Sequence, residues 1–86
     1  DDVSSGFSIM LDANDAPGVL AIIADAFGKH GVSIQSMQQV GRERDAEIVL
    51  ITHAAREADV RRTVEELRNL DCVDRVNSVV RVIDGR

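Results

Sequence analysis

The 86-residue sequence predicts an α+β fold in which two helices alternate with four strands in the order βαββαβ. Apolar residues recur every three or four positions in 17–30 and 57–70, which is the period of a half-buried helix. Extended patterns occupy the segments before, between and after these two stretches. This order is typical of the ferredoxin-like arrangement, a four-stranded antiparallel sheet with both helices on one face. We expect one domain over 1–86, with its core at about 6–84 and its other sheet face open to a partner.

The first strand and the first helix are joined by a turn whose residues suit a helix start. Apolar and more polar residues alternate over 6–12, which predicts a strand with one buried face. Pro17 suits the first position of the helix, and Asn14 or Asp15 can accept hydrogen bonds from its free N–H groups. Gly31 supplies the left-handed residue that ends the helix.

A hairpin of two unlike strands is expected to follow. Alternate residues of 32–40, beginning with Val32 and Ile34, fall on one side of a mostly polar strand. A charged turn at 41–45 leads into 47–53, where nearly continuous apolar and β-branched residues are typical of a central strand.

The second helix presents a charged outer face. Arg61 and Glu65 are four residues apart, as are Arg62 and Glu66, so each pair can form an ion pair worth about 0.2–0.5 kcal/mol. We interpret this face as solvated rather than functional. The closing strand at 73–83 is rich in valine and completes the sheet.

Composition excludes several classes of function. A net charge of -5 and only two aromatic residues argue against binding to nucleic acid, because neither phosphate attraction nor base stacking is provided. No apolar run approaches the roughly 20 residues that span a membrane. The lone Cys72 excludes an internal disulfide, and the sequence carries no signal-peptide pattern, so we expect a cytoplasmic protein. The first residue is not methionine, which leaves open whether the chain is an excised piece of a longer protein.

No set of residues points to catalysis or to metal binding. His30 ends the first helix, where it can cap carbonyl groups, whereas His53 ends a strand and either lines a polar pocket or marks the exit to solvent. Cys72 has no cation beside it in the sequence and is expected to be a packed thiol. The acids and the amide at 12–15 lack the spacing of a calcium loop. We therefore expect no catalytic residue, metal or cofactor.

The turn at 13–18 can bind a carboxylate. Pro17 and Gly18 at a helix start leave free N–H groups at the positive end of the helix dipole. Gly18 allows a ligand to approach closely, and Asn14 or Asp15 can accept from an ammonium group. These features suit an amino-acid zwitterion, although simple helix capping would use the same residues.

Two motifs resemble those of the ACT domain family. The stretch Asn-Asp-Ala-Pro-Gly-Val-Leu at 14–20 is similar to the family's Asp-Lys-Pro-Gly-Val-Leu turn, and 27–34 contains the accompanying Gly-Val-Ser-Ile strand. Ile-Thr-His at 51–53 and Asn-Ser-Val-Val-Arg-Val at 77–82 resemble the carboxy-terminal ACT domain of bacterial homoserine dehydrogenases. Ala16 stands where the family often has Lys, a side chain expected to point into solvent. The resemblance covers nearly the whole chain.

The resemblance implies a regulatory domain rather than an enzyme. Such a domain binds an amino acid between paired copies of itself, and for homoserine dehydrogenases the effector would be threonine, acting by feedback inhibition. The family also implies alternatives: the regulatory domain of acetolactate synthase with valine, that of aspartate kinase with lysine or threonine, and a domain that pairs without binding a ligand. A small enzyme of the acylphosphatase kind is disfavoured, because no phosphate-binding loop is present.

By position, the effector contacts of the family fall on two segments of this chain. The carboxylate would be held by backbone N–H groups at 18–20, the ammonium by Asn14 or Asp15, and a side-chain hydroxyl by Ser33 or Gln35. The residues expected to bind the effector are Asn14, Asp15, Ala16, Gly18, Val19, Leu20, Ser33, Ile34 and Gln35.

Overall fold

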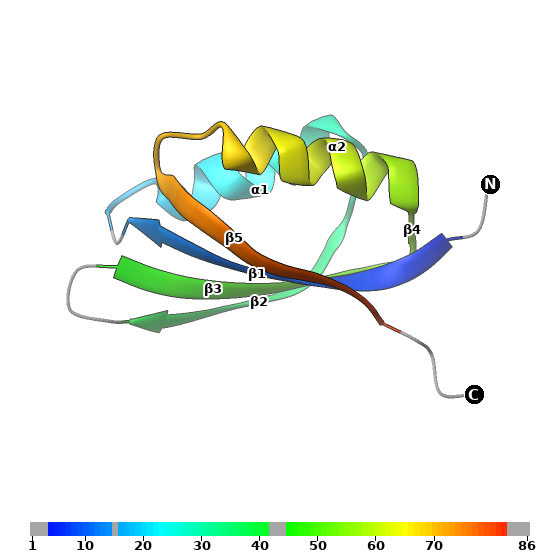
Figure 1. The fold of residues 1–86 in the computed structure, drawn as a ribbon, viewed down its shortest axis with the longest axis horizontal. Helices are drawn as coiled ribbons and strands as arrows, with labels where there is room; N and C mark the ends of the chain where they lie inside the picture. The colour runs from blue at the N-terminus through cyan, green and yellow to red at the C-terminus, as the bar shows by residue number, and fades with distance from the viewer. Residues whose placement is uncertain (1–3, 15, 42–44, 83–86) are drawn as a thin grey trace.

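A computed structural model describes residues 4–14, 16–41 and 45–82, and its elements follow the predicted order with one short strand added (Figure 1). None of the helices in these residues is long and apolar enough to cross a bilayer. The elements are β1 (Ser4–Asn14), α1 (Val19–Lys29), β2 (Ile34–Gly41), β3 (Asp45–Thr52), β4 (Ala55–Arg56), α2 (Glu57–Arg68) and β5 (Val73–Val82).

The sheet is antiparallel and has β1 at its centre. β1 pairs with β3 on one side and with β5 on the other, and β2 pairs with β3, so the long strands lie in the order β2-β3-β1-β5. The two-residue β4 pairs with the start of β1. Both helices cover the same face of the sheet (Figure 1). The predicted ferredoxin-like fold is confirmed.

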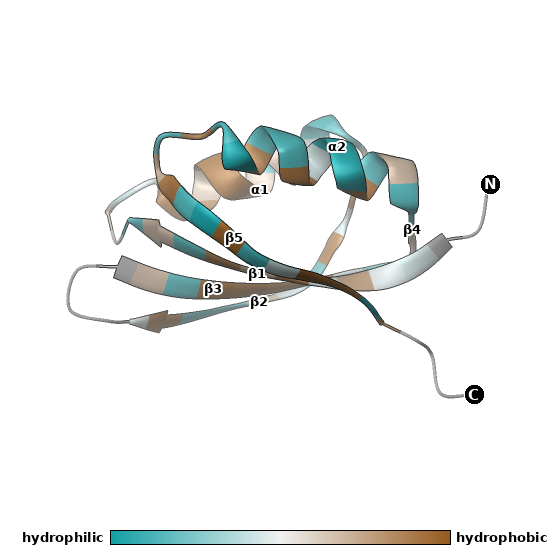
Figure 2. Ribbon diagram, in the orientation of Figure 1, coloured by the Kyte–Doolittle hydropathy of each residue, from teal (hydrophilic) through white to brown (hydrophobic). Residues whose placement is uncertain are grey.

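The core lies between the helices and the central strands. On β1 and β3, Ile9 is paired with Leu50 and Leu11 with Ile48, and all four side chains are almost fully buried. The helices add further apolar side chains, among them the fully buried Phe27 of α1. Figure 2 shows that α1 is apolar over much of its length, whereas hydropathy alternates along α2. This pattern keeps one face of α2 in solvent while the other packs on the sheet.

The start of α1 differs from the predicted one. The helix begins at Val19 after Gly18, which has a φ of 84° and is the N-cap residue, and no side chain caps it. Pro17 therefore lies in the preceding turn instead of at the first helical position. The backbone N–H of Asn14 donates to the carbonyl of Cys72 at 2.9 Å. Because β1 runs to Asn14, few residues remain to reverse the chain, and the left-handed glycine completes the reversal.

The end of α1 agrees with the prediction. Gly31 has a φ of 72°, in the left-handed region that favours glycine. The backbone N–H of Gly31 donates to the carbonyl of Gly28 at 3.1 Å, and that of Val32 donates to the carbonyl of Phe27 at 3.0 Å. These bonds close the last turn of the helix and direct the chain into β2.

The side-chain alternation predicted for the second strand is wrong beyond Ile34, because β2 contains an irregularity at Gln35. Ile34 pairs with Thr52, and Ser36 pairs with Ile51, so an extra residue of β2 stands between two successive positions of β3. Ile34 therefore lies on the face that the helices cover, as the buried Thr52 does, and Ser36 lies on the open face. A spacing of two had predicted a common face for both.

The charged outer face of α2 is solvated, but its ion pairs differ from those predicted. Arg61 pairs with Glu57 at 3.1 Å and Arg62 pairs with Asp59 at 3.0 Å, in place of the acids one turn further along. Side chains on a helix lean towards its N-terminus, and the first turn of α2 carries these two acids.

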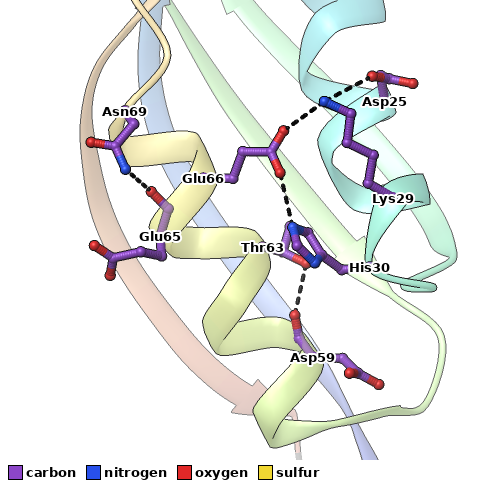
Figure 3. A network of polar contacts seen from close by, with 8 residues as sticks. All are labelled: Asp25, Lys29, His30, Asp59, Thr63, Glu65, Glu66 and Asn69. Carbon is purple, nitrogen blue, oxygen red and sulfur yellow. Dashed lines mark hydrogen bonds and ion pairs between the residues drawn. The ribbon is translucent and has the colours of Figure 1, made fainter.

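Glu66 instead links the two helices (Figure 3). Its Oε1 lies 2.9 Å from Nε2 of His30, and its Oε2 lies 3.2 Å from Nζ of Lys29. The hydrogen bond with His30, followed by that with Lys29, holds the pKa of Glu66 below its usual value of 4.5. The ring of His30 thus joins α1 to α2 and does not cap the carbonyl groups of its own helix.

Candidate functional site

A cavity of about 340 Å³ opens where β1 passes into α1. The turn and the first helical residues form one side of it, and the hairpin end of β2 and β3 forms the other. The lining residues are Asn14, Ala16, Pro17, Gly18, Val19, Leu20, Ala21, Gln39, Ala46 and Ile48. Five of the nine predicted effector-binding residues are therefore brought together in one cavity of a size that suits a small molecule.

Backbone N–H groups at the start of α1 stand beside this cavity. The N–H of Val19 donates to the carbonyl of Ala16 at 3.3 Å. In the part of the chain that the structure describes, the N–H groups of Leu20 and Ala21 have no acceptor, and the first turn carries no acidic side chain. Such a helix end binds anions, because free donors and the positive end of the helix dipole coincide there.

The polar side chains of the lining are neutral. Asn14 contributes an amide from the turn and Gln39 contributes one from β2, while Ala46 and Ile48 supply an apolar wall. Asp15, the remaining predicted residue of the turn, lies outside the described residues. An amide oxygen can accept from an ammonium group, so the cavity combines donors for a carboxylate with acceptors for an amine.

Sequence reasoning missed the hairpin side of the cavity, formed by Gln39, Ala46 and Ile48. The ferredoxin-like arrangement would have indicated these residues, because in it β3 lies next to β1, and the start of β3 is level with the end of β1. Ala46 pairs with Ala13 at this level, and two alanines leave space in front of the turn. Gln39 of β2 could not be predicted in the same way, because its position depends on the register in which β2 pairs with β3, and the bulge shifts that register.

Ser33, Ile34 and Gln35 lie far from the cavity. They stand at the start of β2, level with Thr52 at the end of β3, whereas the cavity lies at the other end of β3, near Asp45. Four to six residues of β3 separate Thr52 from Ile48 and Ala46 of the lining, a distance of roughly 13–20 Å at about 3.3 Å per residue. Within one copy of the chain, the two predicted groups do not form a single site.

The other candidate residues take part in surface contacts or packing. His53 is exposed, and Cys72 is half-buried as a free thiol. The side-chain amide of Asn77 donates to Oδ1 of Asp12 at 3.1 Å. Among the residues that the structure describes, His, Cys, Asp and Glu side chains do not gather in threes where they could hold a metal ion.

Known proteins resemble this chain over nearly its whole length. The sequence pattern of the ACT domain family matches residues 7–72. Homoserine dehydrogenase from Synechocystis sp. is 39% identical over 84 residues, which cover 96% of this chain and 19% of that protein. Homoserine dehydrogenase from Corynebacterium glutamicum is 36% identical over 81 residues, covering 94% of this chain and 18% of that protein.

A solved structure agrees with the sequence comparison. The crystal structure of a homoserine dehydrogenase from Thiobacillus denitrificans matches with a TM-score of 0.85 and 29% sequence identity, covering 95% of this chain and 18% of that one. The chain thus spans about a fifth of the length of the relatives that it matches.

Proposed function

This chain belongs to the ACT domain family, and we propose that it senses threonine as the regulatory domain of a homoserine dehydrogenase. The cavity at the start of α1 carries the proposal, because it joins five predicted contact residues to a helix end with free donors. The similarity to homoserine dehydrogenases supports this parent enzyme and therefore a threonine effector. We expect the domain to work in the cytoplasm, within an enzyme of amino-acid biosynthesis.

The lining suggests how an amino acid would bind. Its carboxylate would accept hydrogen bonds from the N–H groups of Leu20 and Ala21, and its ammonium would donate to the amide oxygen of Asn14. The methyl group of threonine would contact Ala46 and Ile48. A few charge-assisted hydrogen bonds, reduced by the cost of ordering the ligand, correspond to a Kd of about 10 μM to 1 mM.

A second copy of the chain would complete the site. In the described residues β2 pairs only with β3, so its outer edge can accept another strand. If two β2 strands pair antiparallel about a two-fold axis that passes near Met37, the partner's Gln35 lies level with Gln39 of the cavity. The partner's Ser33 and Gln35 would then form hydrogen bonds with the side-chain hydroxyl of the effector. Regulation follows if threonine favours one arrangement of the pair by about 1–3 kcal/mol.

Calorimetry with threonine, serine, lysine, isoleucine and valine tests the proposal. We expect heat of binding with threonine, and at least tenfold weaker binding in Gly18→Asp, where a second carboxylate would face the ligand carboxylate. Gly18→Ala is the matched control, because it introduces the same left-handed strain at a φ of 84° without adding a carboxylate, and nothing lies within 4 Å of the added Cβ. A preference for valine or lysine would reassign the domain to acetolactate synthase or aspartate kinase.

The second candidate function is pairing without a ligand. The exposed Val80 and Val82 on β5 favour it, because apolar side chains at a surface mark contacts between chains. If the chain forms a dimer in sedimentation but shows neither heat nor thermal shift with any proteinogenic amino acid at several millimolar, it serves assembly alone and the sensing proposal is wrong.

A further inference from the structure

A second groove, of about 360 Å³, runs between α2 and β5, at the opposite edge of the sheet from β2. Figure 1 shows α2 lying along β5 there. The helix contributes residues at spacings of one and three over three turns, a stripe roughly 16 Å long at about 1.5 Å per residue. The helix side of the groove consists of Glu57, Val60, Arg61, Val64, Glu65 and Arg68, and the sheet side of Phe7, Val79 and Arg81.

The floor of the groove is apolar and reachable from solvent. Phe7, Val60 and Val64 are at most 8% exposed and form its base, whereas Val79 on β5 is 40% exposed. The guanidinium of Arg81 lies 5.8 Å from the ring centroid of Phe7 and places a positive charge above this base. An aliphatic side chain that entered the groove would bury the exposed part of Val79.

The rim of the groove carries more positive than negative charge. Three arginines and two glutamates line it, although the whole chain has a net charge of -5. Glu57 is shared between Arg61 at 3.1 Å and Arg81 at 2.8 Å. Arg68 has no ion pair or hydrogen-bonded partner among the residues that the structure describes. The groove is therefore complementary to a carboxylate.

The strand beside the groove is an open edge. In the described residues β5 pairs only with β1, and the pairing is regular from Ser78 to Val82, past the two irregularities earlier in the strand. The outer N–H and C=O groups of this part can therefore pair with an added strand. A helix beside an open strand is the arrangement in which extended peptides bind by strand addition. The stripe of roughly 16 Å matches about five residues of extended chain.

We propose that the groove between α2 and β5 docks an extended peptide segment in which a carboxylate lies between aliphatic side chains. The segment adds to β5, one of its aliphatic side chains covers Val79, and its carboxylate pairs with Arg68. A second copy of the chain fits less well, because it brings the same surplus of arginine. The relatives are about five times as long, so the source we infer is the enzyme polypeptide outside this domain, which rests on the proposed function.

A peptide titration followed by NMR tests the docking site. The probe is the blocked peptide Thr-Val-Thr-Glu-Thr-Val-Thr, which has the same sequence in both directions, and its control carries Lys in place of Glu. We expect the Glu peptide to shift amide signals of β5 and α2, leave those of β2 unchanged, and bind at least tenfold more tightly than the Lys peptide. Arg68→Glu should weaken binding at least tenfold. Arg75→Glu, on β5 but outside the groove, should bind like the parent chain.

Several results would overturn the docking site. They are the absence of shifts at about 2 mM peptide, equal binding of the Lys peptide, and the same shifts produced by free isovalerate, which would indicate a pocket for small carboxylates. Self-association that Arg68→Glu abolishes and the peptide does not displace would assign the groove to a second copy. The cavity at the start of α1 lies beside β2 and β3, away from the edge strand β5. A threonine titration that shows no binding therefore does not affect the outcome of the peptide titration.

Discussion

The hydroxyl of Thr52 accepts a backbone hydrogen bond that no neighbouring strand accepts, and its removal should lower the free energy of unfolding. β1 pairs with β3 from Ser8 onward and with β4 through Ser5, and Phe7 lies between these two ladders. The backbone N–H of Phe7 donates to Oγ1 of Thr52 at 3.0 Å, inside the core. Thr52 is 1% exposed, so water cannot take over this role. Thr52→Val keeps the shape of the side chain and leaves the buried donor without an acceptor.

The structure supplies a matched control for this substitution. Thr63 is also completely buried, but its hydroxyl donates at 2.8 Å to the carbonyl of Asp59, one turn earlier in α2. That carbonyl is also the position to which the backbone N–H of Thr63 donates in a helix, so Thr63→Val leaves it satisfied. Thr52→Val should lower the free energy of unfolding by about 1–3 kcal/mol, and Thr63→Val should change it by less than about 0.5 kcal/mol.

Urea unfolding followed by far-UV circular dichroism measures both variants, because the chain has no Trp or Tyr for fluorescence. In a domain of this size, each kcal/mol lost should also lower Tm by about 4–8 °C. Equal losses in the two variants would show that the methyl packing, and not the hydrogen bond to Phe7, determines the effect. A loss below about 0.5 kcal/mol in Thr52→Val would refute the reasoning outright.

Further predictions concern two glycines and one carboxylate. Gly28→Ala should raise the free energy of unfolding by about 0.5–1 kcal/mol, because an added Cβ meets nothing within 4 Å on the helix. Gly31→Ala, at a φ of 72°, should lower it by about 1–2 kcal/mol. Thermal unfolding should therefore show a higher Tm for Gly28→Ala and a lower Tm for Gly31→Ala. The pKa of Glu66 is held below 4.5 by His30 and Lys29, so its stabilisation is present above that pH and lost as pH falls through the folded-state pKa. The difference in unfolding free energy between the parent chain and Glu66→Gln, measured from urea midpoints between roughly pH 3 and 7, should therefore become smaller in acid. A difference that does not change with pH would contradict this role of Glu66.

The element order was predictable because the signals that encode it are local. Apolar periods of two and near four identify strands and helices, and a left-handed Gly31 ends α1 where the sequence indicated. The bulge at Gln35 was not predictable in the same way, since no glycine or proline marks it. It lies where β2 pairs with Thr52 and Ile51 at the end of β3, a contact between two segments that no local pattern encodes. A single extra residue then reverses the faces of all the side chains that follow.

Only part of the candidate site could be assigned to one cavity from the sequence, and the remaining part has a geometric reason. The turn from Asn14 to Leu20 forms a local motif, so its residues could be assigned to one cavity from the sequence. Ser33 and Gln35 are fixed by a strand that begins at the other end of the sheet, roughly 13–20 Å along β3 from the residues that line the cavity. No side-chain rotation spans that distance, so both groups can contact one effector only if the second group belongs to another copy. Ser33→Ala and Gln35→Ala should therefore weaken threonine binding only under conditions in which the chain is paired, as dilution in calorimetry would reveal.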